Sequence, residues 1–276
     1  MAAMNLEDHA GDVVGKARRQ AGLDVATVAA RAGLSPAAWE RFEATGAAES
    51  RPDYAAVGEL LGLDGAKLAA LADGWAPEPP DLTRWREVRV ITTRGPAFSV
   101  NAFLIWDEVT REAALFDTGY DAAPVLRLIR EETLTLRYIF LTHHHGDHVA
   151  ALAAVRKAHP GARLRAGGEE VPLHERNRAS DFLHLGGLRL SNRATPGHSA
   201  DSVTYLVGNW PEDAPAVAVV GDALFAGSMG HVPGDAAAAR RVIREQILSL
   251  PADTLICPGH GPLTTVGQEQ RHNPFF

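Results

Sequence analysis

Apolar residues recur at helical spacing through the first 75 residues of the chain. Valine and alanine lie three and four positions apart in 13–17 and again in 25–29, so that each segment has one apolar face. Serine or aspartate precedes further helices that we predict at 37–44, 54–61 and 66–71. This pattern indicates a small all-α domain.

The pattern changes after a proline-rich segment. Residues 76–81 contain prolines at 77, 79 and 80 and cannot continue a helix. Beyond them, short apolar runs typical of strands alternate with helical stretches. We predict strands at 88–92, 100–106, 113–116, 138–141, 163–166, 188–190, 203–207, 217–220 and 255–257, and helices near 122–131, 149–158 and 236–250. The chain therefore divides into a helical domain (1–75), a linker (76–85) and an α/β domain (86–276).

Composition indicates the class of protein and the cellular compartment in which we expect it. Of 276 residues, 46% are hydrophobic and 22% are charged, which is typical of a globular protein. The single cysteine, Cys257, excludes an internal disulfide, and residues 1–15 lack the apolar core of a secretory signal. No apolar run approaches the roughly 20 residues that span a bilayer. We expect a cytoplasmic protein that does not act in a membrane.

The predicted strand at 138–141 runs directly into four side chains of metal-ligand type: His143, His145, Asp147 and His148. Imidazole nitrogens and carboxylate oxygens are ligands that zinc and similar divalent ions prefer. Four of them within six residues cannot all face one ion from regular structure. Two neighbouring ions explain the arrangement better.

Three more residues of this type lie at turns beside predicted strands, and each has a glycine next to it. They are His198, Asp222 and His260. Glycine lets the backbone turn tightly at such a position. With the four residues above, the sequence offers seven ligands for one site holding two metal ions.

The motif T-H-H-H-G-D-H at 142–148 resembles that of the metallo-β-lactamase superfamily. Further motifs resemble the short bacterial glyoxalase II-like hydrolases, and together they cover nearly all of residues 86–276. They are D-T-G at 117–119, T-P-G-H-S at 195–199, G-D-A-L-F-A-G at 221–227, P-G-H-G-P at 258–262 and N-P-F at 273–275. The resemblance implies an αββα sandwich with its site at the strand ends.

The resemblance also implies a role for each ligand. The first metal would be held by His143, His145 and His198, the second by Asp147, His148 and His260, and Asp222 would bridge them. We expect two divalent ions, zinc in the first place and iron(II) or manganese(II) as alternatives.

Asp147 and Asp222 would be the catalytic carboxylates. Two divalent metal ions at this site would lower the pKa of a bridging water from about 16 toward about 7, so that hydroxide would form and attack the substrate. Asp117 follows a strand and would orient a metal-bound histidine rather than bind metal itself.

Substrate contacts are less sharply indicated. Members of the family that this chain resembles carry arginine shortly after the 221–227 motif, whereas this chain has His231. Without that arginine, an anionic glutathione thioester is disfavoured as the substrate. His231 is then a candidate contact for a different ligand. The polar stretch at 172–182 and its neighbourhood supply Arg176, Arg178 and His184 as further candidates.

The expected activity is hydrolysis of a small ester, thioester or lactone. One alternative is a persulfide dioxygenase with a single iron held by His143, His198 and Asp222. Another is a regulator that senses a metabolite and binds DNA.

The helical domain resembles Cro/C1-type (XRE-like) helix-turn-helix domains through 15–23, 28–34 and 35–43. In that family polar side chains near the start of the third helix read base edges, but here Ala37 and Ala38 stand there. Residues 1–75 carry 7 basic and 11 acidic side chains, a net charge of −4. We therefore expect an interaction module or a homodimer contact, and keep DNA as a partner that is not favoured.

Overall fold

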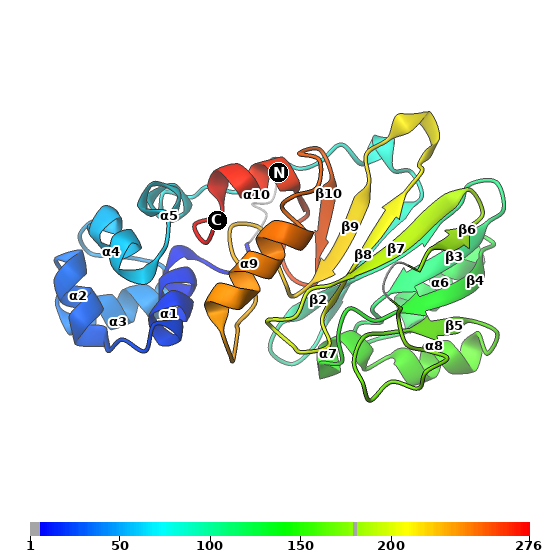
Figure 1. Ribbon diagram of the computed structural model, residues 1–276, viewed down its shortest axis with the longest axis horizontal. Helices are drawn as coiled ribbons and strands as arrows, with labels where there is room; N and C mark the ends of the chain where they lie inside the picture. Colours follow the sequence, from blue (N-terminus) through cyan, green and yellow to red (C-terminus); the bar gives the residue numbers. More distant parts are fainter. Residues whose placement is uncertain (1–5, 179–180) are drawn as a thin grey trace.

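The computed structural model describes residues 6–178 and 181–276. A bundle of helices lies at one end of the elongated molecule and a two-sheet sandwich at the other (Figure 1). The described residues contain no helix that is both long and apolar enough to cross a membrane.

Five helices build the N-terminal bundle: α1 (Ala10–Gln20), α2 (Val25–Ala32), α3 (Pro36–Thr45), α4 (Tyr54–Leu61) and α5 (Gly65–Ala72). Side chains cap their N-termini as predicted; Ser35, for example, accepts the amide of Ala38. Trp39 and Phe42 of α3 are fully buried and pack at a ring-centroid distance of 5.4 Å. This arrangement confirms the helical N-terminal region.

The first sheet has the strand order β1-β2-β3-β4-β5, and the second has the order β11-β10-β9-β8-β7-β6. The strands of the first sheet are β1 (Val88–Arg94), β2 (Ser99–Trp106), β3 (Glu112–Phe116), β4 (Thr135–Phe140) and β5 (Arg163–Arg165). Those of the second are β6 (Leu183–Leu185), β7 (Leu188–Ala194), β8 (Val203–Gly208), β9 (Val217–Gly221), β10 (Leu255–Pro258) and β11 (Thr264–Thr265).

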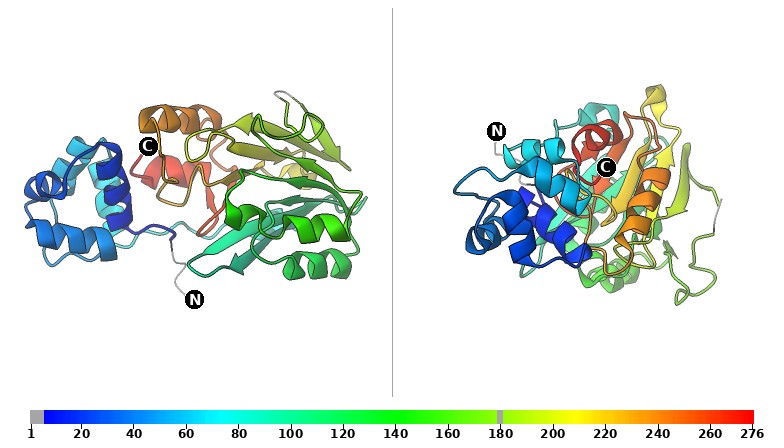
Figure 2. Two further views of the ribbon diagram at one scale, coloured as in Figure 1. Left: turned by 90° about the horizontal axis from the view of Figure 1, so that it is seen from below. Right: turned by 60° about the vertical axis from the view of Figure 1, so that its left-hand side comes forward.

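One apolar cluster fills the space between the two sheets; within it Phe116 stacks on Phe140, and Tyr205 packs against both rings at a tilt. A second cluster packs α6 (Ala123–Glu131) and α8 (Leu152–Ala158) on the outer face of the first sheet. On the other side, α9 (Ala236–Gln246) packs on the outer face of the second sheet, close to α10 (Val266–His272). The layers are therefore αββα, as predicted (Figure 2).

The apolar cluster under α9 continues without interruption into the helical bundle. The Trp75 ring stacks on His272 at 4.9 Å, and the Asp64 amide donates to the Pro274 carbonyl at 2.8 Å. The two parts of the chain thus share one core, which the proline-rich segment between them did not indicate.

The short elements that the sequence pattern does not indicate include β6, β11 and α10. The two strands contain only three and two residues, too few for a visible alternation. Helix α10 buries the polar side chains Gln268 and Glu269, so its buried face does not look apolar in the sequence.

Candidate metal centre

Strand direction brings the seven candidate ligands to one end of the sandwich. Strands β9 and β10 are parallel, and β7 has the same direction because β8 is antiparallel to both of its neighbours. His198, Asp222 and His260 follow the carboxyl ends of these three strands. The segment 143–148 follows β4 of the other sheet and enters the short helix α7 (Gly146–Val149).

Three imidazoles face one another in a first group. His145 Nδ1 lies 3.0 Å from His143 Nε2 and 2.9 Å from His198 Nε2. Three ring nitrogens this close share a space that suits a cation, and their ligand atoms all lie within 4.8 Å of one another.

The second group contains one carboxylate and two imidazoles. Asp147 Oδ2 lies 3.2 Å from His260 Nε2 and 3.4 Å from His148 Nε2. These three ligand atoms also lie within 4.8 Å of one another. His148 is completely buried and His260 nearly so.

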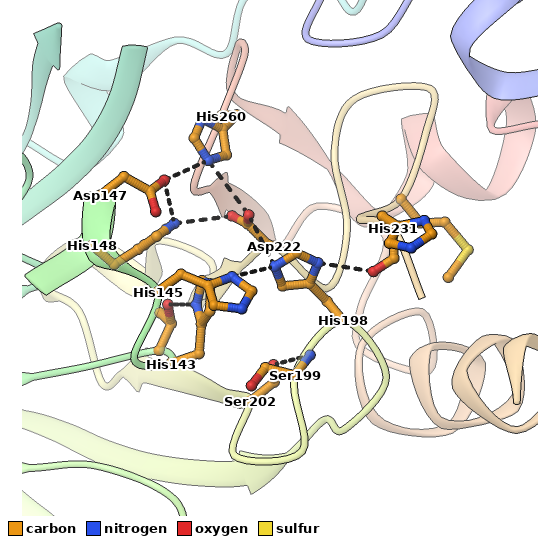
Figure 3. Close-up of polar contacts among 12 residues, drawn as sticks. His143, His145, Asp147, His148, His198, Ser199, Ser202, Asp222, His231 and His260 are labelled. Atoms are coloured by element: carbon orange, nitrogen blue, oxygen red, sulfur yellow. Dashed lines mark hydrogen bonds and ion pairs between the residues drawn. The ribbon is translucent and has the colours of Figure 1, made fainter. Parts of the chain in front are cut away.

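Asp222 stands between the two groups (Figure 3). Its Oδ2 lies 3.5 Å from His198 Nε2 of the first group and 3.4 Å from His260 Nε2 of the second. Its Oδ1 lies 3.2 Å from His148 Nε2. A carboxylate in this position would be within reach of a cation held by either group.

The donor set fits two divalent cations. His148 Nε2 and Asp222 Oδ1 are buried and make no hydrogen bond, although buried polar atoms are almost always paired. Burial lowers the pKa of His143 to about 4, so its ring is neutral and its nitrogen lone pair is free for a metal. Burial also lowers the pKa of His260, but Asp147 and Asp222 outweigh it and raise that pKa to about 10. The carboxylates of Asp147 and Asp222 thus favour positive charge at the place where a cation would bind.

The second ring nitrogen of each of three ligands meets an oxygen. His148 Nδ1 donates to Asp117 Oδ2 at 2.8 Å, His198 Nδ1 to the His231 carbonyl at 2.9 Å, and His260 Nδ1 to the Ser99 carbonyl at 2.6 Å. Such bonds fix the ring orientation and aim the Nε2 atoms at the centre.

Asp117 is held firmly in its orienting position. Its carboxylate accepts the amide of Thr142 and the Thr142 hydroxyl, both at 2.8 Å, besides the ring of His148. It is 1% exposed, and its φ of 56° lies in the left-handed region. Contact with His148 rather than with the centre is the geometry expected for a residue that orients a ligand.

The candidate substrate contacts lie in different places. His231 meets the site through its backbone carbonyl, while its exposed ring points away from the seven ligands (Figure 3). The Arg176 guanidinium donates to the Val171 carbonyl at 3.2 Å, in a groove of about 560 Å³ that Asp201 also lines. His184 belongs to β6, at the edge of the sheet furthest from β10 and β11.

The backbone of Arg178 bonds to the second sheet, since its carbonyl accepts the side-chain amide of Asn192 in β7 at 3.2 Å. Residues 179 and 180 of the polar stretch lie outside the described residues.

Phe98 is a residue of the site that the sequence analysis does not single out. It lies between β1 and β2, is 45% exposed, and meets the His260 ring edge-on at 5.4 Å. Tyr120 lies beside it at 6.3 Å. An aromatic residue near Gly95 and Pro96 was the only available signal, and it is a weak one.

Two family profiles match the chain. That of the metallo-beta-lactamase superfamily matches residues 95–260, which include all seven candidate ligands. That of a helix-turn-helix domain matches residues 9–71.

Individual relatives agree with the first profile. The hydroxyacylglutathione hydrolase GloC of Haemophilus influenzae is 32% identical, over 65% of this chain and 94% of its own length. The human mitochondrial persulfide dioxygenase ETHE1 is 31% identical, over 65% of this chain and 72% of its own length. The crystal structure of the BLEG-1 B3 metallo-beta-lactamase superposes with a TM-score of 0.59 at 30% identity, over 68% of this chain and 99% of that one.

Proposed function

The chain belongs to the metallo-beta-lactamase superfamily, with a helix-turn-helix domain at its N-terminus, and on that premise we propose that it hydrolyses a small ester, thioester or lactone. One observation carries the proposal: the Asp222 carboxylate lies within 3.5 Å of imidazoles from both ligand groups. This position supports a site for two ions rather than one.

Two bound divalent ions would supply an acidified water as nucleophile and stabilise negative charge on the carbonyl oxygen. His143, His145 and His198 would hold one ion, Asp147, His148 and His260 the other, and Asp222 both. The chain's own task is positioning: Asp117 holds the His148 ring, and the carbonyls of His231 and Ser99 hold two more. Metal sites keep their geometry when such partners are rigid.

The loop that follows Asp222 favours an uncharged substrate. Residues 228–233 contain no arginine or lysine to pair with a carboxylate, and the exposed ring of Phe98 offers an apolar surface beside His260. We therefore place a neutral lactone, ester or simple thioester before a glutathione thioester. The similarity to GloC supports hydrolysis as the reaction class more than it supports glutathione as part of the substrate.

A persulfide dioxygenase is the second candidate, favoured by the similarity to human ETHE1. In that reading His143, His198 and Asp222 would hold a single iron. The complete second group around His260 favours the hydrolase.

Metal analysis of the purified chain, followed by turnover of an ester, thioester and lactone panel, separates the two candidates. Two zinc ions per chain with hydrolysis support our proposal. One iron, with oxygen consumed on addition of a persulfide, supports the alternative.

For the helix-turn-helix domain we propose a role as an interaction or dimer contact. Several exposed arginines are already paired with carboxylates, among them Arg31 with Glu59 and Arg51 with Asp73. Paired arginines contribute little to phosphate binding, which depends on free positive charge. A gel shift with genomic fragments at low salt tests this role, and sequence-selective nanomolar binding would overturn it.

A further inference from the structure

Helix α1 of the helical domain lies against the loop 222–232, which contains Asp222 and His231. Residues 222–230 of this loop are all buried. Residues 10–20 of α1 lie before the segment 95–260 that matches the metallo-beta-lactamase profile. Contacts between α1 and the loop therefore involve residues outside the part of the chain that matches this family.

The loop 222–232 sets the position of the metal centre at two points. Asp222 supplies the carboxylate between the two ligand groups, and the His231 carbonyl accepts His198 Nδ1 at 2.9 Å. Gly230 lies very close to Asp222 and His198. A Cβ at this glycine would be 2.0 Å from the Asp222 backbone carbonyl oxygen and 3.0 Å from His198 Nδ1. A shift of the loop would therefore move Asp222, which stands between the two groups, and the carbonyl that orients His198.

Two charged residues of the helical domain hold this loop. Lys16 Nζ donates to the Met229 carbonyl at 3.0 Å and pairs with the Asp8 carboxylate. Ser228 Oγ donates to Asp8 Oδ2 at 2.6 Å. The Lys16 and Asp8 side chains are only 14% and 9% exposed, and Ser228 is fully buried, so water competes little for these bonds.

Lys16 also lies near the metal centre, from which the Phe225 ring separates it. Its Nζ lies 5.4 Å from the centre of the Phe225 ring, and Phe225 meets the His260 ring edge-on at 5.7 Å. Helix α1 is itself anchored on its other side, where Arg18 pairs with Glu43 of α3 at 2.6 Å. The loop thus rests on a fixed support.

We propose that Asp8 and Lys16 are positioning residues of the metal centre, and that the helical domain is a structural part of the enzyme because it holds the loop 222–232 in its metal-binding position. The inference rests on the proposed function only in that divalent metal binds at these ligands. Partners that orient metal ligands typically contribute about 10- to 100-fold in metal affinity.

The test compares two lysines that cross the same boundary. Lys16→Met removes the donor to the loop, whereas Lys67→Met removes the 2.8 Å bond from Lys67 Nζ to the Gln270 carbonyl of α10, a bond in which no residue of the loop takes part. Zinc affinity of each full-length variant is measured by competition with a chromophoric chelator, and folding by thermal unfolding of the metal-free protein. We expect Lys16→Met to weaken zinc binding about 10-fold or more. Lys67→Met should match the wild type, and Lys16→Arg should recover most of the affinity.

Equal zinc affinity in Lys16→Met and the wild type would overturn the proposal, and so would equal losses in the two methionine variants. Should Lys16→Met fail to fold, Asp8→Asn decides, because it keeps the volume of the side chain and removes only its charge. Unchanged zinc affinity in a folded Asp8→Asn protein would contradict the inference. The readout is metal affinity, so a wild type that binds zinc without hydrolysing any ester refutes the proposed function and leaves this test valid.

Discussion

Replacing Gly230 with alanine tests how closely the loop 222–232 determines the metal centre. The glycine is close-packed against its neighbours without needing an unusual backbone, since its φ is not in the left-handed region. The added methyl group would lie 2.0 Å from the Asp222 carbonyl oxygen, where ordinary contact begins at 3.4 Å. One of the two must therefore move by more than 1 Å, and the His198 ring, 3.0 Å away, is pushed as well.

A displacement of about 1 Å at a reacting centre costs on the order of 100-fold in rate. We therefore expect Gly230→Ala to lower kcat/KM at least 100-fold, which corresponds to about 2.7 kcal/mol in the activation free energy. Metal content should fall as well, because Asp222 and His198 belong to the proposed ligand set.

The assay is hydrolysis of the best substrate from the panel, together with the metal content of the same sample. Gly234→Ala is the matched control: it lies four residues further along, and no atom comes within 4 Å of a Cβ built there. It should keep full activity. A Gly230→Ala protein with two ions and wild-type kcat/KM would refute the reasoning, and so would equal losses in both variants.

Three further predictions concern the surroundings of the centre. Asp117→Asn, which weakens the bond to His148 Nδ1, should lower zinc affinity about 10- to 100-fold in a chelator competition; an unchanged affinity would remove Asp117 from its orienting role. Adding zinc at about 100 times its Kd should stabilise the chain by about 2.7 kcal/mol and raise Tm by several degrees in a calorimeter, and a Tm that ignores zinc would contradict this. Burial raises the pKa of Glu269 to about 7, so the folded chain holds this proton more tightly than the unfolded chain. The free energy of unfolding should then fall as pH rises from about 4.5 to about 7, by up to roughly 1.4 kcal/mol per pH unit, and denaturant titrations should show that Glu269→Gln loses this slope.

The fold and the residues of the candidate centre could be predicted because their signals are local. His143 and His148 follow an apolar strand directly, and His198, Asp222 and His260 each stand beside a glycine at a strand end. Side-chain chemistry at such turns is visible in the sequence without knowledge of distant contacts.

The supports of the centre could not be predicted, since they depend on the tertiary fold. The carbonyls of Ser99 and His231 orient two ligands, but every residue has a carbonyl, so the sequence carries no mark of them. Lys16 and Asp8 look like solvated charges of a surface helix, and only the packing of α1 on the sandwich gives Lys16 the Met229 carbonyl as a partner. His231 is a candidate substrate contact in the sequence, and the role of its backbone carbonyl as acceptor for His198 Nδ1 is visible only in the structure.

The most direct test of two ions held around Asp222 is the metal content of the purified chain, measured by mass spectrometry after dialysis, for the wild type and for Asp222→Ala. The account predicts about two divalent ions per wild-type chain. In the folded variant it predicts one ion or none, with hydrolysis lost. A folded wild-type chain that takes up no transition metal, or an Asp222→Ala protein that keeps two ions and full activity, would contradict it.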